Sequence, residues 1–251
     1  MSTADAPLSV TVIGCSGGYS SDESSCSSYL VRSPTTTVLL DAGPGSSIEL
    51  QRHVQLEDLD AIVLSHEHPD HWTELPVLYH AYRYFMEASV PVYGTVGTHR
   101  LLDGLLPEAN KTAFEWTDIN PASVFSIGDL SFTFSLTDHP VETLAIRVQH
   151  GDRALVYSAD TGPEWSPAAF EAPIDVMIYE ASLTIDFEDK DIPHVSGRQA
   201  GLRAAEAGVG QLVLTHVNPG GDPRERRNEA EQVFPGAIHL AYPGFTLPIE
   251  A

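Results

Sequence analysis

The sequence predicts an α/β fold in which two β-sheets lie together and helices cover their outer sides. Two observations favour this class. Short apolar strands joined by hairpin turns dominate the first part of the 251-residue chain, and strands alternate with helices in the later part. No repeat of fixed period and no low-complexity linker divides the sequence. We therefore expect one domain over residues 1–251, with residues 1–7 disordered.

In the first part of the chain, β-rich apolar runs end at clusters of turn residues. The first run stops at the Gly-rich segment 14–18, and two further runs flank the dipeptide Ser33-Pro34, which predicts a hairpin. A Gly-rich turn over residues 41–45 then separates a strand from a helix. The elements expected in this part are strands at residues 8–14, 26–32, 36–40 and 61–65, and helices at residues 46–54 and 72–87.

In the later part, apolar runs of strand length recur between segments with helical spacing. Ser196 is a candidate N-cap and Gly208 a candidate stop signal for one of these helices. The strands expected here are residues 90–93, 130–137, 143–149, 154–158, 175–179, 211–215 and 237–241. The helices expected here are residues 99–106, 196–207 and 222–234.

The charge of the chain excludes several classes of partner. There are 35 acidic against 13 basic side chains, which gives a net charge of −22. Proteins that grip long nucleic acids usually present a basic face, and anionic membrane surfaces also attract basic segments. We therefore expect neither a long nucleic acid nor a membrane as partner. A small anionic substrate stays compatible with this charge, because a metal ion can reverse the local field.

Targeting signals and cysteines point to the cytoplasm. No run approaches the length of about 18 apolar residues that a membrane-spanning helix needs. Residues 1–9 have neither the basic nor the apolar region of a signal peptide. The two cysteines, Cys15 and Cys26, are too few for a disulfide framework and are expected to be small buried thiols.

One short segment carries most of the chemical information. His66, His68, Asp70 and His71 lie within six residues, directly after the predicted strand 61–65. Imidazole and carboxylate groups are good ligands for Zn²⁺ and similar divalent ions. In an extended segment His66 and His68 point the same way and can bind one ion together. Asp70 and His71 follow the turn at Pro69 and can face a second ion.

Three further ligand-type residues stand at the ends of predicted strands. His139 follows the strand 130–137, Asp160 follows 154–158, and His216 follows 211–215. A rigid scaffold presents functional groups at such positions. Each residue alone is a weak signal, but together with the histidine-rich segment they predict a metal centre.

This set of residues resembles the metallo-β-lactamase superfamily over residues 8–249. The resemblance implies a four-layer αββα sandwich and two divalent metal ions per chain, zinc in preference and manganese as the alternative. It implies that His66, His68 and His139 hold one ion, that Asp70, His71 and His216 hold the other, and that Asp160 bridges them. Asp41 matches a recurring aspartate that orients a ligand histidine, although a turn or N-cap role explains Asp41 equally well.

The branch of the superfamily follows from two further motifs. Asp160 stands where the true β-lactamases that use cysteine have that residue, which disfavours them. The segments around Glu180 and His194 are similar to motifs of the ribonuclease Z branch, although Tyr179 replaces a usual histidine there. The resemblance implies that His194 is a general acid, that Glu180 is its partner, and that Asp70 both binds metal and orients the attacking hydroxide.

The substrate class depends on what this chain lacks. The tRNA-processing members carry a tRNA-binding arm, usually between the residues that match His139 and Asp160, but here a hairpin of only 20 residues, 140–159, separates them. The loop 19–25 is acidic where that branch carries basic residues. The chain looks more like armless bacterial ribonuclease Z-like hydrolases, including atypical cyclic-nucleotide phosphodiesterases. This implies hydrolysis of small phosphodiesters by a metal-bridging hydroxide. The alternatives are a ribonuclease Z-type tRNA 3′-end endonuclease and a lactonase or thioesterase.

The aromatic segment 72–87 has three interpretations. It can pack in the core, form the face of a homodimer, or stack on a nucleobase. Arg83 within it can reach a substrate phosphate, although a surface role explains this arginine as well. We expect a homodimer.

Overall fold

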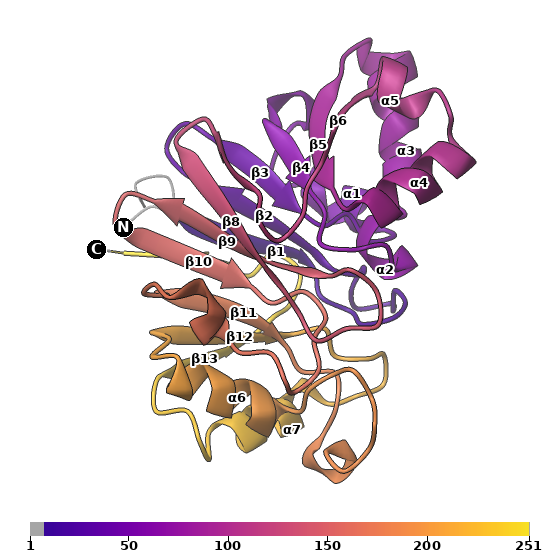
Figure 1. Ribbon diagram of the computed structural model, residues 1–251. Coiled ribbons are helices and arrows are strands. Elements are labelled where there is room, and N and C mark those ends of the chain that lie inside the picture. Colours follow the sequence, from indigo (N-terminus) through magenta and orange to yellow (C-terminus); the bar gives the residue numbers. More distant parts are fainter. Residues whose placement is uncertain (1–7, 251) are drawn as a thin grey trace.

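The computed structural model describes residues 8–250, so the prediction for residues 1–7 lies outside it. Two seven-stranded sheets face each other, and helices cover the outer face of each (Figure 1). One hydrophobic core fills the space between the two sheets. A second core lies between the first sheet and its helices, and a third lies between the second sheet and its helices. The predicted four-layer αββα sandwich is confirmed.

The first sheet has the strand order β14-β1-β2-β3-β4-β5-β6. Strands β14 to β3 pair antiparallel, and strands β3 to β6 pair parallel. Its strands are β1 (Ser9–Gly14), β2 (Ser28–Arg32), β3 (Thr37–Leu40), β4 (Ala61–Val63), β5 (Val90–Gly94), β6 (Phe114–Asp118) and β14 (Thr246–Pro248).

The second sheet has the strand order β13-β12-β11-β10-β9-β8-β7. Its strands β7 to β10 pair antiparallel, and β10 to β13 pair parallel. Its strands are β7 (Val124–Ile127), β8 (Leu130–Leu136), β9 (Leu144–His150), β10 (Arg153–Tyr157), β11 (Val176–Glu180), β12 (Gln211–Thr215) and β13 (Ala237–Leu240).

The helices pack outside the sheets. The first sheet is covered by α1 (Ser46–Leu50), α2 (Pro69–Trp72), α3 (Leu75–His80), α4 (Val96–Leu105) and α5 (Ala109–Thr112), and the second by α6 (Gly197–Glu206) and α7 (Pro223–Ala230). Ser196 caps α6 as predicted, and Gln199 completes a capping box. No helix among residues 8–250 is long and apolar enough to cross a membrane.

The central strands are apolar on both faces because both faces are covered. In β1, Val10 and Val12 enter the core between the sheets, whereas Ile13 packs under the helices of the first sheet. In β11, Ile178 faces the other sheet and Met177 faces the helices. Alternation with period two therefore divides each strand between an inner and an outer core.

Three strands were missing from the prediction, and all three are sheet edges. β6 and β14 are the edges of the first sheet, and β7 is one edge of the second. An edge strand exposes one side to water, so it lacks the continuous apolar run that marks a buried strand. The sequence of β6, for example, alternates buried Phe114 with exposed Glu115. The hairpins predicted around Ser33-Pro34 and within residues 140–159 are both confirmed, and the second turns at Gly151.

The helical segment predicted over residues 72–87 is confirmed in outline, but it is not one regular α-helix. The segment divides into the end of α2, then α3, and then a π-helical turn at Ala81–Met86. Glu74, between α2 and α3, turns its carboxylate toward α1 and accepts the backbone N–H of Gly45 at 2.7 Å. Tyr82 is buried and donates its hydroxyl to the carbonyl of Leu56 at 2.6 Å. Both side chains thus make tertiary hydrogen bonds within this irregular helical segment.

Candidate metal centre

The predicted site residues meet at one edge of the sandwich. Strands β3, β4, β10, β11 and β12 end at this edge, and Asp41, His66, Asp160, Glu180 and His216 stand at or just beyond those ends. The carboxyl ends of parallel strands are the usual place for a ligand in α/β sheets. The topology thus gathers residues that lie up to 175 positions apart, from Asp41 to His216.

Left-handed backbone turns deliver three of these groups. Asp41, Ala159 and His216 have φ angles of 55°, 52° and 59°. Each is a non-glycine residue within two positions of a strand end, and Ala159 directly precedes Asp160. Such a conformation costs about 1–3 kcal/mol, and it persists where the surrounding structure determines it.

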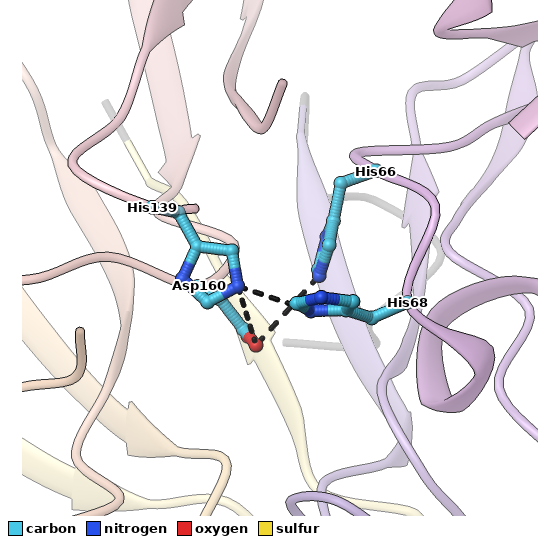
Figure 2. A group of neighbouring side chains, drawn as sticks. All are labelled: His66, His68, His139 and Asp160. Atoms are coloured by element: carbon cyan, nitrogen blue, oxygen red, sulfur yellow. Dashed lines mark hydrogen bonds and ion pairs between the residues drawn. The ribbon is translucent and has the colours of Figure 1, made fainter. Parts of the chain in front are cut away.

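The first cluster contains three histidines and one aspartate. His66, His68, His139 and Asp160 each offer one ligand atom, and these atoms lie within 4.8 Å of one another (Figure 2). His139 Nε2 lies 3.0 Å from His68 Nδ1, and Asp160 Oδ2 lies 3.7 Å from His66 Nε2. The Nδ1 of His139 is 3.2 Å from the carbonyl of Pro193, which leaves its Nε2 for the cluster.

The second cluster lies beside the first. Asp70, His71 and His216 also offer ligand atoms within 4.8 Å of one another. Asp70 Oδ2 is 3.6 Å from His71 Nε2 and 3.3 Å from His216 Nε2. The backbone N–H of Gly18 donates to the same Asp70 oxygen at 2.8 Å and holds the carboxylate in place.

Asp160 joins the two clusters through its two oxygens. Oδ2 faces the first cluster, 3.7 Å from His66 Nε2 and 3.9 Å from His139 Nε2. Oδ1 faces the second cluster, 3.2 Å from His71 Nε2 and 3.3 Å from His216 Nε2. With one oxygen toward each cluster, Asp160 could serve both, which is the role that the resemblance implies.

The donor set fits divalent metal ions. Among the described residues, two buried ligand atoms have no hydrogen-bond partner, His66 Nε2 and Asp160 Oδ1, and both point into the clusters. A buried polar atom without a partner is costly unless something else satisfies it. Burial and the neighbouring His71 lower the pKa of His66 well below its ordinary value. A lowered pKa favours the neutral imidazole, which is the form that binds a metal ion.

Asp41 is the centre of a hydrogen-bond network behind the clusters. Its carboxylate accepts the backbone N–H of Ser65 at 2.7 Å and the hydroxyl of Tyr157 at 2.9 Å. His71 Nδ1 lies 2.7 Å from Asp41 Oδ2, and the Ser65 hydroxyl donates to the same oxygen at 2.8 Å. Asp41 thus fixes the ring of His71 directly, which supports the predicted orienting role over a simple turn or N-cap role.

Glu180 and His194 form a second network on the other sheet. His194 Nδ1 lies 2.8 Å from Glu180 Oε1, and this buried carboxylate also accepts the backbone N–H of Thr161 at 2.8 Å. Burial lowers the pKa of His194, but the charge and hydrogen bond of Glu180 outweigh it and raise the pKa to about 9. The His194 side chain remains 24% exposed, and it lies within 4.8 Å of ligand atoms of Asp160 and His216.

The structure brings together every predicted residue except Arg83. Arg83 is exposed on the π-helical turn, with its guanidinium 5.8 Å from the centre of the Tyr84 ring. No hydrogen bond or ion pair among residues 8–250 joins it to the clusters, and its contact with substrate stays a prediction. Sequence reasoning did not single out Ser65, Tyr157 and Ser182, which hydrogen-bond to Asp41 and Glu180. The feature of the sequence that could have indicated these three residues was their position next to the motifs that contain the predicted site residues.

Comparison with known proteins identifies the family. The chain belongs to the β-lactamase superfamily, because residues 36–217 match the model of the beta-lactamase superfamily domain. It is 33% identical over 243 residues to the probable metallo-hydrolase YhfI of Bacillus subtilis, covering 95% of this chain and 98% of that protein. The crystal structure of YhfI gives a TM-score of 0.88 at 32% identity, covering 97% of this chain and 99% of that one.

Two proteins of the ribonuclease Z type are also similar to this chain, one in sequence and one in fold. The chain is 27% identical over 271 residues to ribonuclease Z of Methanopyrus kandleri, covering 93% of this chain and 95% of that protein. Human tRNase Z, short form, shares the fold with a TM-score of 0.78 at 18% identity, covering 97% of this chain and 100% of that one. The predicted superfamily is therefore confirmed, and this chain shares a family with a probable metallo-hydrolase. It is also similar to ribonuclease Z proteins, the branch that the sequence resembles.

Proposed function

We propose that this protein is a metal-dependent phosphodiesterase that acts on small phosphodiesters such as cyclic nucleotides. The observation that carries the proposal is the position of His194, which Glu180 holds at 2.8 Å while the ring borders the joined clusters. Because Nδ1 is engaged by Glu180, the free Nε2 is the atom that can give a proton to a leaving oxygen.

The two clusters would hold two divalent ions, zinc in preference and manganese as the alternative. His66, His68 and His139 would bind one, Asp70, His71 and His216 the other, with Asp160 shared. Bound there, the ions supply Lewis acidity toward an attacking water and toward the phosphoryl oxygens. Asp70 is positioned by Gly18 to orient that water, and His194 protonates the leaving group.

The choice of a small phosphodiester rests on charge and on the short hairpin. β9 and β10 turn directly at Gly151, so no arm for tRNA extends between His139 and Asp160. The net charge of −22 disfavours a long polyanion. The ribonuclease Z of Methanopyrus kandleri makes tRNA 3′-end cleavage the second candidate. A lactone or thioester needs no general acid at His194, which makes that class separable by experiment.

The deciding experiment is a substrate panel with zinc-loaded and manganese-loaded protein. It contains cyclic AMP, an aryl phosphodiester, a precursor tRNA, a lactone and a thioester. We expect cleavage of the two small phosphodiesters, and a loss of about 10²- to 10⁴-fold in kcat in His194→Ala. Cleavage of precursor tRNA alone, or lactone hydrolysis that His194→Ala leaves intact, would contradict the proposal.

His150→Ala is the matched control. His150 also pairs with a carboxylate, Asp129, at 3.2 Å, and its side chain has the same 24% exposure as that of His194. It lies at the end of β9, in the hairpin away from the clusters, so its loss should leave kcat unchanged. We also expect a homodimer acting in the cytoplasm, for which sedimentation and cell fractionation are the tests.

A further inference from the structure

Two buried carboxylates, one from each sheet, are each linked to two histidines. Asp41 follows β3 and Glu180 ends β11. Each carboxylate bonds one imidazole directly, His71 for Asp41 and His194 for Glu180. Each also accepts a hydrogen bond from a serine hydroxyl that in turn contacts another histidine. The two serines, Ser65 and Ser182, are nearly inaccessible to water.

At Ser65 the direction of the hydrogen bonds follows from counting protons. The hydroxyl lies 2.8 Å from Asp41 Oδ2 and 2.9 Å from His66 Nδ1. A hydroxyl has one proton to donate, and a carboxylate accepts only. The proton therefore goes to Asp41, and the Ser65 oxygen accepts from His66 Nδ1–H. This places the lone pair of His66 on Nε2, the atom that has no partner among the described residues.

At Ser182 the same logic holds. The hydroxyl lies 2.7 Å from Glu180 Oε2 and 3.0 Å from His216 Nδ1. The carbonyl of His216, at 3.1 Å, is a second acceptor for the hydroxyl proton, but the shorter contact to a charged oxygen is the stronger. With either acceptor the proton points away from the ring, so the oxygen accepts from His216 Nδ1–H. The lone pair of His216 then lies on Nε2, which faces Asp70 and Asp160.

We propose that Ser65 and Ser182 are positioning residues that fix the ring tautomers of His66 and His216 for metal binding. Asp41 thereby controls one histidine of each cluster, His71 directly and His66 through Ser65. Glu180 controls His194 directly and His216 through Ser182. The inference rests on the metal centre of the proposed function and not on its substrate.

The first test observes the ring protons. In zinc-loaded protein labelled with ¹⁵N-histidine, NMR should show slowly exchanging Nδ1–H signals for His66 and His216. In Ser65→Ala the His66 signal should be lost to exchange with water, and in Ser182→Ala the His216 signal. The variants Ser65→Thr and Ser182→Thr keep the hydroxyl and should keep the signals. A protected Nδ1–H signal that persists in an alanine variant would overturn the inference for that histidine.

The second test measures zinc affinity by competition with a chromophoric chelator. Each alanine variant should bind one of its two ions about tenfold more weakly, which is a typical effect of losing a hydrogen bond to a ligand histidine. Ser46→Ala is the control, because Ser46 is equally buried but its hydroxyl has no partner among residues 8–250. Unchanged affinities in both alanine variants would overturn the inference. A parent protein that binds zinc but cleaves no phosphodiester would overturn only the proposed function.

Discussion

The two carboxylate networks differ in their access to water. On the first sheet, Asp41, Ser65 and His71 are all completely buried. On the second sheet, Glu180 and Ser182 are also buried, but their network ends at His194, whose side chain is 24% exposed. The two networks share one carboxylate, one serine and two histidines, and the Asp41 carboxylate also accepts the hydroxyl of Tyr157.

This difference separates two tasks. A network closed off from water can hold imidazole tautomers but has no route by which to exchange a proton with a substrate. The network around Glu180 keeps one imidazole at the surface of the site, where a proton can be delivered and replaced. We infer that the first sheet mainly organises metal ligands, while the second also handles protons. The predictions below test this division.

The largest effect on metal binding and on the stability of the fold is expected from Asp41→Asn. The amide would present a donor where His71 and Ser65 need an acceptor, so affinity for both ions should fall about 10- to 100-fold. The free energy of unfolding should also fall by about 3 kcal/mol, because buried donors lose their partner. Chelator competition and urea denaturation measure the two quantities. Asp60→Asn, an exposed carboxylate beside Thr37, is the control. If Asp41→Asn bound both ions with the affinity of the parent protein, the inference that the first sheet mainly organises metal ligands would be wrong.

Glu180→Gln should show the opposite pattern. The amide oxygen can still accept one hydrogen bond, but the charge that keeps His194 protonated is gone. We expect kcat for phosphodiesters to fall about 10²- to 10³-fold, while affinity changes by at most about tenfold for one ion. Glu231→Gln, whose carboxylate pairs with Arg227 on the surface, is the control. Equal losses of metal in Glu180→Gln and Asp41→Asn would argue that both networks do the same work.

Two buried tyrosines allow a finer test of the Asp41 network. Tyr157 donates to the Asp41 carboxylate at 2.9 Å, and its neighbour Tyr29 shares a hydrogen bond of 2.7 Å with the Thr215 hydroxyl. Hydrogen bonds to a charged acceptor contribute more than neutral ones. Tyr157→Phe should therefore lower the free energy of unfolding by about 2 kcal/mol and Tyr29→Phe by about 1 kcal/mol. Urea denaturation of the metal-free variants gives both values, and the reverse order would mean that Asp41 does not depend on Tyr157.

The sequence was sufficient to predict the clusters because their residue types recur at strand ends. His66, Asp160 and His216 each follow an apolar run, and the carboxyl ends of such strands converge in an α/β fold. The serines were not predictable in the same way. A single Ser65 or Ser182 has no pattern of its own. Its role appears only when the fold brings a group from another strand end within hydrogen-bonding distance, Asp41 for Ser65 and His216 for Ser182.

The fold shows the same limit. Strands buried on both faces were found from their apolar runs, but the edge strands β6, β7 and β14 were not. The segment 72–87 is largely helical, as its spacing predicts, but the interruption at residues 73–74 and the π-helical turn Ala81–Met86 were not predicted. Local spacing thus predicts the type of element but not its irregularities, where Glu74 and Tyr82 make tertiary hydrogen bonds.

The smallest effect is expected at a carboxylate outside the metal centre. Asp129 accepts the hydroxyls of Ser33 and Thr36 and faces His150 at 3.2 Å. Burial raises the pKa of Asp129, but the hydrogen bonds together outweigh it and lower the pKa from 3.8 to about 2. A lowered pKa stabilises the fold above the ordinary value and loses that contribution as pH falls through about 2. Because Asp129 is exposed, water screens the interaction, and its contribution should stay below about 1 kcal/mol.

Asp129→Asn tests this with metal-free protein. The difference in urea midpoint between parent and variant should be constant above pH 4 and should shrink toward zero near pH 2. These limits follow from the ordinary pKa of 3.8 and the pKa of about 2 in the folded protein. Zinc affinity should not change, because Asp129 contacts no residue of the clusters among residues 8–250. A midpoint difference that persists at pH 2 would mean that shape rather than charge stabilises this contact. A change in zinc affinity would mean that the closed network around Asp41 extends beyond the edge of the sandwich where the metal ligands meet.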